Sequence, residues 1–180
     1  MGSTFLTMPS GYTRTEAAYV FDEGRSFVMY SQQLLGRFLE GSLLRNTSGD
    51  NKNQSVWNLK LNILEEDKII PNVVWGVSDL RRELGSKVFY FAASKNFEVF
   101  GLFLHGGFFK DPVTTARKGF WGIEKTILPL ISVAGERVEE KNSVAIKLRP
   151  YPSVSVEYIT QNIGTEKKRE AYVLRYVQAF

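Results

Sequence analysis

Apolar and polar residues alternate with a period of two in several separate stretches of this 180-residue chain. In residues 56–63, tryptophan, leucine and isoleucine occupy positions 57, 59, 61 and 63, whereas asparagine and lysine occupy positions 58, 60 and 62. Residues 144–149 and 154–158 repeat this pattern, and residues 172–177 show a weaker form of it. Successive side chains of a β-strand point to opposite faces, so the pattern predicts strands with one apolar and one polar face.

Clusters of turn-forming residues divide the chain into twelve predicted strands. Their expected spans are 14–21, 25–32, 36–46, 54–64, 72–79, 87–95, 97–109, 118–124, 128–137, 142–149, 153–160 and 169–180. Residues 31–44 also fit an amphipathic helix, and residues 88–93 are apolar on both faces. Gly36 and Gly41 disfavour the helix, and β-branched and aromatic residues favour a strand in the second segment. We therefore predict an all-β chain of about twelve strands, with ten as the alternative.

The predicted links between the strands alternate in length. Those after the third, fifth, seventh, ninth and eleventh strands are longer and polar, whereas the intervening links are mostly tight. Short turns at one end and longer loops at the other are typical of transmembrane β-barrels. No uncharged apolar run reaches the roughly 18 residues of a membrane-spanning helix, so strands would have to span the membrane. The predicted fold is one closed, antiparallel, up-and-down transmembrane β-barrel over residues 1–180, with residues 1–12 as a periplasmic leader or short plug.

Two orientations of the faces have to be distinguished, because a soluble barrel that binds an apolar ligand turns its apolar face inward and a membrane barrel turns it outward. The polar face combines charges of both signs with glycines, which suits an enclosed, partly hydrated lumen. Aromatic residues gather near the predicted strand ends, which suits a membrane–water boundary. We therefore predict an outward apolar face. The predicted lumen charges are Glu40, Lys60, Asp79, Glu124, Glu136, Lys147, Arg149, Glu157 and Arg175. The predicted lipid-facing residues are Trp57, Leu59, Leu61, Ile63, Val144, Ile146, Leu148, Val154, Val156, Tyr158, Tyr172, Leu174, Tyr176 and Phe180.

The amino-acid composition limits which metal sites and partners the chain can have. The chain has no cysteine and a single histidine, so a thiolate metal site is excluded and a zinc site is disfavoured. We expect neither a metal nor a cofactor. The formal net charge of +4 is dispersed along the chain, so nucleic acid is not an expected partner. Membrane lipid and small solutes are the expected partners.

His105 is the one residue that invites a catalytic interpretation. An outer-membrane hydrolase could use it with Ser94 or Ser132 as the nucleophile. Neither serine lies in a Gly-x-Ser-x-Gly element, so a hydrogen-bonding residue of the lumen is the better interpretation of His105. The predicted lumen glutamates are interspersed with lysine and arginine, so ion pairing explains them better than acid–base catalysis. No enzymatic activity is predicted.

The segment 172–180, Tyr-Val-Leu-Arg-Tyr-Val-Gln-Ala-Phe, resembles the C-terminal signature of bacterial outer-membrane barrels. In that signature a terminal phenylalanine follows hydrophobic residues at every second position. Gln178 occupies a position that often holds an aromatic residue. The resemblance implies a location in the bacterial outer membrane. It also implies that Tyr176 and Phe180 form the assembly signal, with the barrel assembly machinery as a partner.

A second resemblance covers much of the chain. Residues 6–11, 71–79, 91–95 and 119–124 resemble, in order, segments of the YjbH-like outer-membrane proteins associated with exopolysaccharide secretion. Those proteins are usually much longer, so the resemblance implies a barrel and not a polysaccharide role. The predicted function is a nonenzymatic outer-membrane barrel, either a narrow pore or a structural barrel, with a charged lumen largely filled by side chains. The alternatives are a soluble β-barrel that binds an apolar ligand and, less favoured, a barrel hydrolase that uses His105.

Overall fold

The computed structural model of the chain describes residues 14–22, 25–34, 38–48, 52–83, 85–111, 113–164 and 168–179. These residues form twelve strands and one short 3-10 helix. The strands are β1 (Arg14–Asp22), β2 (Arg25–Leu34), β3 (Leu39–Asn46), β4 (Ser55–Leu64), β5 (Asn72–Ser78), β6 (Val88–Phe97), β7 (Leu102–Lys110), β8 (Arg117–Leu128), β9 (Ile131–Val138), β10 (Lys141–Tyr151), β11 (Val154–Ile163) and β12 (Arg169–Ala179), and the helix is η1 (Glu98–Phe100). No helix in these ranges is long and apolar enough to cross a membrane. The suggested leader or plug at residues 1–12 lies outside the described residues.

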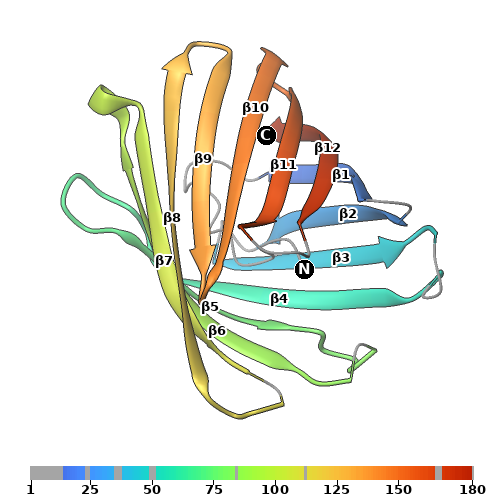
Figure 1. Ribbon diagram of the computed structural model, residues 1–180. Helices are drawn as coiled ribbons and strands as arrows, with labels where there is room; N and C mark the ends of the chain where they lie inside the picture. Colours follow the sequence, from blue (N-terminus) through green and yellow to red (C-terminus); the bar gives the residue numbers. More distant parts are fainter. Residues whose placement is uncertain are drawn as a thin grey trace.

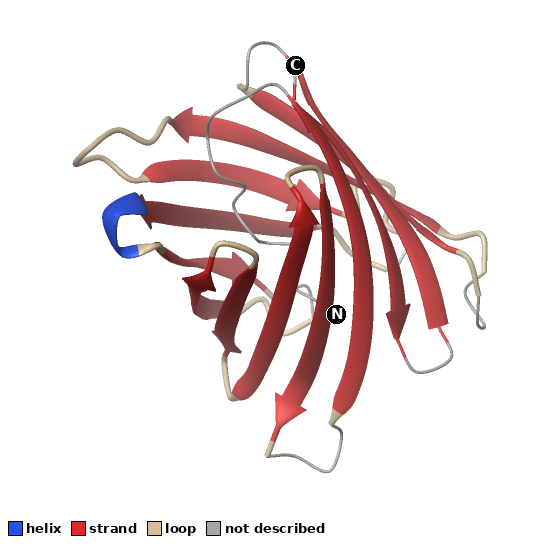
Figure 2. Ribbon diagram, turned by 90° about the horizontal axis from the view of Figure 1, so that it is seen from above, coloured by secondary structure: helices blue, strands red, loops and turns tan. Residues whose placement is uncertain are grey.

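The twelve strands close into a single barrel (Figures 1 and 2). Each strand pairs antiparallel with the next along the chain, and β1 pairs with β12 in a register that runs from Arg14 opposite Ala179 to Asp22 opposite Ala171. In Figure 1, β3 and β4 run across the view whereas β8, β9 and β10 stand upright, as the strand tilt of a closed barrel requires. The predicted closed, up-and-down barrel of twelve strands is confirmed, and the ten-stranded alternative is wrong.

In the segment 31–44, residues 31–34 end β2 and residues 39–44 belong to β3, where an amphipathic helix was the alternative. Leu34 at the end of β2 lies opposite Leu39 at the start of β3, so the chain reverses between them. Every second residue of a barrel strand faces the interior, and Glu40 and Ser42 of β3 alternate in this way with Leu39 and Gly41. Leu34 and Leu39, two of the apolar residues that fit a helix, therefore lie on two adjacent strands.

Two predicted turns are displaced along the chain. A strand starting at residue 97 was expected, but Glu98–Phe100 forms η1 and Gly101 adopts a left-handed conformation with φ 56°, so β7 begins at Leu102. Residues 125–127 were expected to turn, but β8 continues to Leu128 and the chain reverses at Pro129 and Leu130. Proline has no backbone N–H to donate to a strand ladder, so Pro129 ends β8 more effectively than Lys125 would.

The predicted alternation of the links holds only in part. At the end of the barrel that carries the longer loops, the links span residues 47–54, 79–87, 111–116 and 164–168, but the link between β9 and β10 is only Glu139 and Glu140. At the opposite end, which we call the short-link end, residues 98–101, 129–130 and 152–153 are tight, whereas residues 65–71 form a longer link between β4 and β5.

The link 65–71 completes the sheet where β5 is too short. β5 begins at Asn72, opposite Ser94, so β6 extends beyond it by three residues. The carboxylate of Glu66 accepts the backbone N–H of Asn96 at 2.6 Å, and Lys95 Nζ donates to the carbonyl oxygens of Asp67 and Ile70. The link thus pairs the backbone N–H of Asn96 at this sheet edge, and Lys95 in turn pairs two carbonyl groups of the link.

Candidate pore lumen

Strand β10 shows how the two faces of the barrel differ. Val144, Ile146 and Leu148 are 42%, 50% and 44% exposed, whereas Lys147 between them is half-buried. The side chain of Lys147 reaches Glu124 of β8, although β9 lies between these strands in the sheet. Side chains of next-nearest strands converge on the concave side of a curved sheet. The charged face of β10 is therefore the inner wall, and its apolar face is the outer surface.

The predicted lipid-facing residues that the structure describes fall into two groups. Trp57, Ile63, Val144, Ile146, Leu148, Val156, Tyr172, Leu174 and Tyr176 are exposed, and Leu59, Leu61, Val154 and Tyr158 are half-buried. Neighbouring outer side chains pack on one another: the rings of Tyr158 and Tyr172 have centroids 5.2 Å apart. Phe180 lies outside the described residues. Contact of this surface with lipid stays a prediction, as does the role of Tyr176 and Phe180 as an assembly signal.

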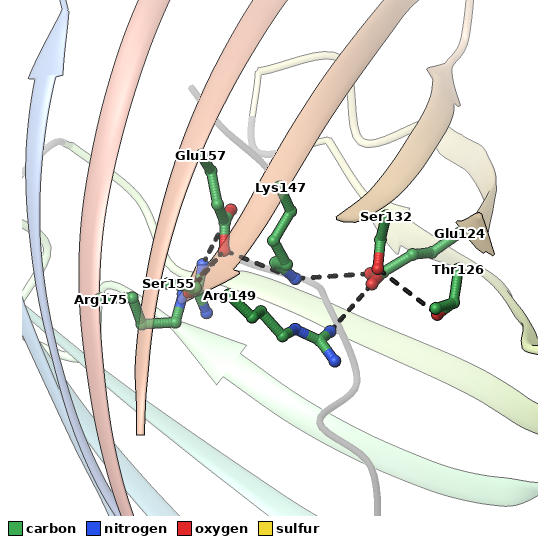
Figure 3. A network of polar contacts seen from close by, with 8 residues as sticks. All are labelled: Glu124, Thr126, Ser132, Lys147, Arg149, Ser155, Glu157 and Arg175. Atoms are coloured by element: carbon green, nitrogen blue, oxygen red, sulfur yellow. Dashed lines mark hydrogen bonds and ion pairs between the residues drawn. The ribbon is translucent and has the colours of Figure 1, made fainter. Parts of the chain in front are cut away.

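A continuous set of ion pairs crosses the inner wall from β8 to β12 (Figure 3). Arg149 Nη2 lies 3.0 Å from Glu124 Oε1, and Lys147 Nζ lies 3.4 Å from Glu124 Oε2. Lys147 Nζ also lies 3.4 Å from Glu157 Oε1, and Arg175 Nε lies 3.2 Å from the same oxygen. Lys147 thus bridges two carboxylates, and Glu157 bridges two cations. We call these five residues the ion-pair chain.

The ion-pair chain is buried to different depths along its length. The side chain of Glu157 is 7% exposed, whereas that of Arg149, near the short-link end, is 46% exposed. Ser155 Oγ adds a contact of 3.5 Å to Glu157 Oε1. A buried carboxylate is tolerable only when opposite charges and hydrogen-bond donors compensate for lost hydration, and Glu157 receives both.

Glu40 and Lys60 form a separate ion pair on the strands across the barrel from the ion-pair chain. The two residues are register partners on β3 and β4, and Lys60 Nζ lies 2.8 Å from Glu40 Oε2. Both side chains are largely buried. Directly opposed residues of antiparallel strands have Cβ atoms about 5 Å apart, which brings the two charged groups together without reaching across another strand.

His105 pairs with Glu136 across an intervening glycine. His105 Nε2 on β7 lies 3.2 Å from Glu136 Oε2 on β9, and Gly122 of β8 lies opposite both residues in the register. A Cβ atom on residue 122 would overlap the His105 ring. Gly122 therefore leaves the space through which the imidazole reaches the carboxylate. The prediction placed Glu136 in the charged lumen, but the sequence pattern did not identify His105 as its partner.

Neither serine considered as a nucleophile is hydrogen-bonded to His105. Ser94 lies opposite His105 in the register, but in the part of the chain that the structure describes, Ser94 Oγ and His105 Nδ1 are buried without a hydrogen-bond partner. Ser132 Oγ lies 3.4 Å from Thr126 Oγ1 instead. A serine nucleophile requires a base within hydrogen-bond reach, so the geometry gives the hydrolase interpretation no support.

Asp79 lies outside the strand wall in which the prediction placed it. β5 ends at Ser78, and Asp79 begins the following link with φ 57°, a conformation that terminates an extended strand. Its backbone N–H donates to Asn58 Oδ1 at 3.1 Å, and its carboxylate accepts the backbone N–H of Glu83 at 2.8 Å. Asp79 thus fixes the start of a loop.

An apolar cluster that was not predicted from the sequence fills part of the inner wall. Val74, Tyr90, Ala92 and Phe120 are buried together, and Phe109 and Val138 pack against them. Gly76 makes room for one of these rings, because a Cβ there would overlap Tyr90. The signal was present in residues 88–93, which are apolar at both alternating sets of positions. A strand that is apolar on both faces must turn one apolar face inward, so this pattern predicts an apolar region of the inner wall.

No group of three or more metal-binding side chains is placed to hold an ion within the described ranges. Neither a family model nor a curated protein sequence matches this chain. Solved structures with a similar fold do match it, and three of them are compared with this chain below.

The KdgM porin matches with a TM-score of 0.61 and 10% identity, covering 91% of this chain and 98% of that chain. The KdgM porin in complex with disordered oligogalacturonate matches with a TM-score of 0.59 and 10% identity, over 93% of this chain and 99% of that chain. The NanC porin matches with a TM-score of 0.52 and 11% identity, over 93% and 99% of the two chains. The chain therefore has the fold of porin-like β-barrels.

Proposed function

We propose that this chain is a nonenzymatic β-barrel of the bacterial outer membrane that forms a narrow pore for ions or small solutes. One observation carries this proposal: ion pairs connect β8 to β12 on the inner wall of a closed barrel whose outer surface is apolar. The porin-like fold of the structural neighbours supports the same interpretation.

The outer surface favours a lipid environment. Large apolar side chains such as Ile63 on β4, Trp121 on β8 and Tyr172 on β12 are at least half-exposed, on strands spread around the barrel. A soluble protein rarely exposes so extended an apolar surface, because each square ångström left in water costs about 25 cal/mol. A soluble barrel with an apolar ligand would need these side chains inside, so that alternative has no support.

The inner wall favours a narrow passage. Glu124, Lys147 and Arg149 keep part of their side chains accessible, so an ion in the lumen would meet charges of both signs. A barrel of this strand number has a lumen that side chains can fill to a large extent. The buried apolar cluster around Tyr90 and Phe120 favours a second candidate, a structural barrel with a closed lumen.

Planar-bilayer conductance distinguishes the two candidates. The pore predicts discrete, small channel openings from the refolded protein. The Glu124→Gln variant removes a negative charge from the wall and should shift the ion preference towards anions, whereas Glu170→Gln, in an exposed ion pair with Lys168, should not. A folded protein that inserts but never conducts would refute the pore and leave the structural barrel.

The outer-membrane location rests on the C-terminal resemblance together with the exposed position of Tyr176 on β12. A membrane barrel should require detergent for solubility and should migrate differently on a gel before and after boiling. Replacing Tyr176 with serine should slow assembly by the barrel assembly machinery in a reconstituted assay. Soluble, monodisperse protein without detergent would contradict the membrane assignment. The YjbH-like relationship stays part of this proposal and adds no polysaccharide role to it.

The absence of enzymatic activity is also part of the proposal. Lipid and ester hydrolysis by the wild type and by His105→Ala should be equal and at background level. Activity that disappears in the variant would restore the hydrolase interpretation.

A further inference from the structure

Large apolar side chains project from successive links at the short-link end of the barrel. Ile69 in the link between β4 and β5 is 90% exposed, and Val99 in η1 is 93% exposed. Phe38, Phe100 and Leu130, in the links before β3, β7 and β9, are also exposed. Because alternate links of an antiparallel barrel lie at the same end, these side chains form one apolar rim, which we define by these five residues.

The opposite end of the barrel lacks such a rim among the described residues. Its links 47–54, 79–87 and 139–140 contain no exposed large apolar side chain in their described parts. The exception is Val113, which is 87% exposed in the loop 111–116 and is surrounded by polar residues such as Thr114 and Thr115. The two ends of the barrel therefore differ in how many large apolar side chains their described links expose.

Lysines near the apolar rim bond to the backbone of the links that carry it. Lys125 Nζ donates to the carbonyl oxygen of Phe100, next to Val99. Lys95 Nζ donates to the carbonyl oxygens of Asp67 and Ile70, on either side of Ile69. A link in water needs no such partners, because water hydrates its carbonyl groups. Carbonyl groups near hydrocarbon do need protein donors, since no water is there to hydrogen-bond them.

We propose that the apolar rim is a lipid-binding surface that sits in the interfacial layer of the membrane, while the loops at the other end extend into water. This inference rests on the proposed membrane function and adds the depth and orientation of the barrel. The rim is continuous with the apolar outer face through Phe97 and Ile127, both exposed at the adjoining strand ends. Lysine side chains at such a position can bury their methylene groups and place the ammonium group at the polar boundary.

Single-cysteine variants test the inference directly, because the natural sequence has no cysteine. Val99→Cys places a spin label on the rim, and Val113→Cys is the matched control at the other end. Ile146→Cys places a third label on the outer face of β10. Each labelled protein is refolded into phosphatidylcholine vesicles without any partner protein, and its folding is checked by the gel shift on boiling.

The measured quantity is the ratio of label accessibility to oxygen, which concentrates in lipid, and to a water-soluble nickel chelate. We expect this ratio to be severalfold higher at residues 99 and 146 than at residue 113. If the label at 99 matches that at 113 while the label at 146 remains in lipid, the rim proposal is refuted and the membrane barrel stands. If the label at 146 is as exposed to nickel as that at 113, the proposed membrane function itself is refuted.

Discussion

Replacing Glu157 with glutamine tests whether the ion-pair chain stabilises the barrel. Glutamine keeps the size of the side chain and removes its charge. The carboxylate of Glu157 lies 3.4 Å from Lys147 Nζ and 3.2 Å from Arg175 Nε. With an effective dielectric constant of about 20, each contact corresponds to a gross attraction of about 5 kcal/mol. Desolvation offsets much of this attraction, and breaking a buried pair typically costs about 3–5 kcal/mol. The cations are each about one-fifth exposed, so we expect a loss of about 2–3 kcal/mol in the free energy of unfolding.

The assay is reversible urea unfolding in lipid vesicles, followed by tryptophan fluorescence. Glu170→Gln is the matched control, because Glu170 makes a 3.0 Å ion pair with Lys168 in which both side chains are exposed. Solvent screens that pair, so its loss should change the unfolding midpoint far less. Equal losses of unfolding free energy in the two variants would refute the view that the ion-pair chain stabilises the barrel because it is buried.

Three further substitutions test other parts of the wall and loops. Ser94→Ala should leave the unfolding free energy unchanged or raise it by up to about 1 kcal/mol, because Ser94 Oγ is buried and has no hydrogen-bond partner among the described residues; a clear loss in the same urea assay would contradict this. Gly122→Ala should lower that free energy by about 1–3 kcal/mol, because the added methyl group overlaps the His105 ring. An unchanged midpoint would contradict the contact of His105 with Glu136 across Gly122. Asp111→Asn should speed amide hydrogen exchange in the loop 111–116. A hydrogen bond from Lys118, helped by backbone N–H groups, holds the pKa of Asp111 below its usual range. The wild-type loop should therefore keep its protection above the usual carboxyl pKa and lose it only as pH falls further, through the lowered value; equal exchange in variant and wild type would refute this role.

The barrel itself could be predicted from the sequence because strand alternation is a local property. Residues 56–63 alternate so regularly that their two faces are defined without knowledge of any neighbour. Closure was less direct, since it depends on β1 meeting β12 across the whole chain. The number of strands and their two-faced character were sufficient to predict it.

Turn positions were less predictable because turn-forming residues compete within a few positions. Lys125 and Pro129 are four residues apart, and only the strand register shows that β8 continues past the first and ends before the second. The predicted spans leave residues 65–71 as a link, as observed, but its structural role was not predicted. The link supplies Glu66 as the partner of the Asn96 backbone N–H, beyond the start of the short β5.

The charged side chains could be assigned to a common face, but their partners could not. Alternation places Glu124 and Lys147 on the same face, whereas their contact depends on how far the sheet curves over β9. The pairing of His105 with Glu136 depends on a glycine in the strand between them. Such contacts are set by sheet curvature and by the size of a third residue, neither of which appears in the alternation pattern.

The pairing of β1 with β12 has a consequence for how the protein folds. These strands are the first and last of the sheet, so the final ladder joins residues far apart in the sequence, such as Arg14 and Ala179. Any nascent or truncated chain that lacks β12 would expose two open edges that recruit strands from other molecules. Ring closure must therefore follow the synthesis of β12, and the open sheet needs protection from aggregation until then.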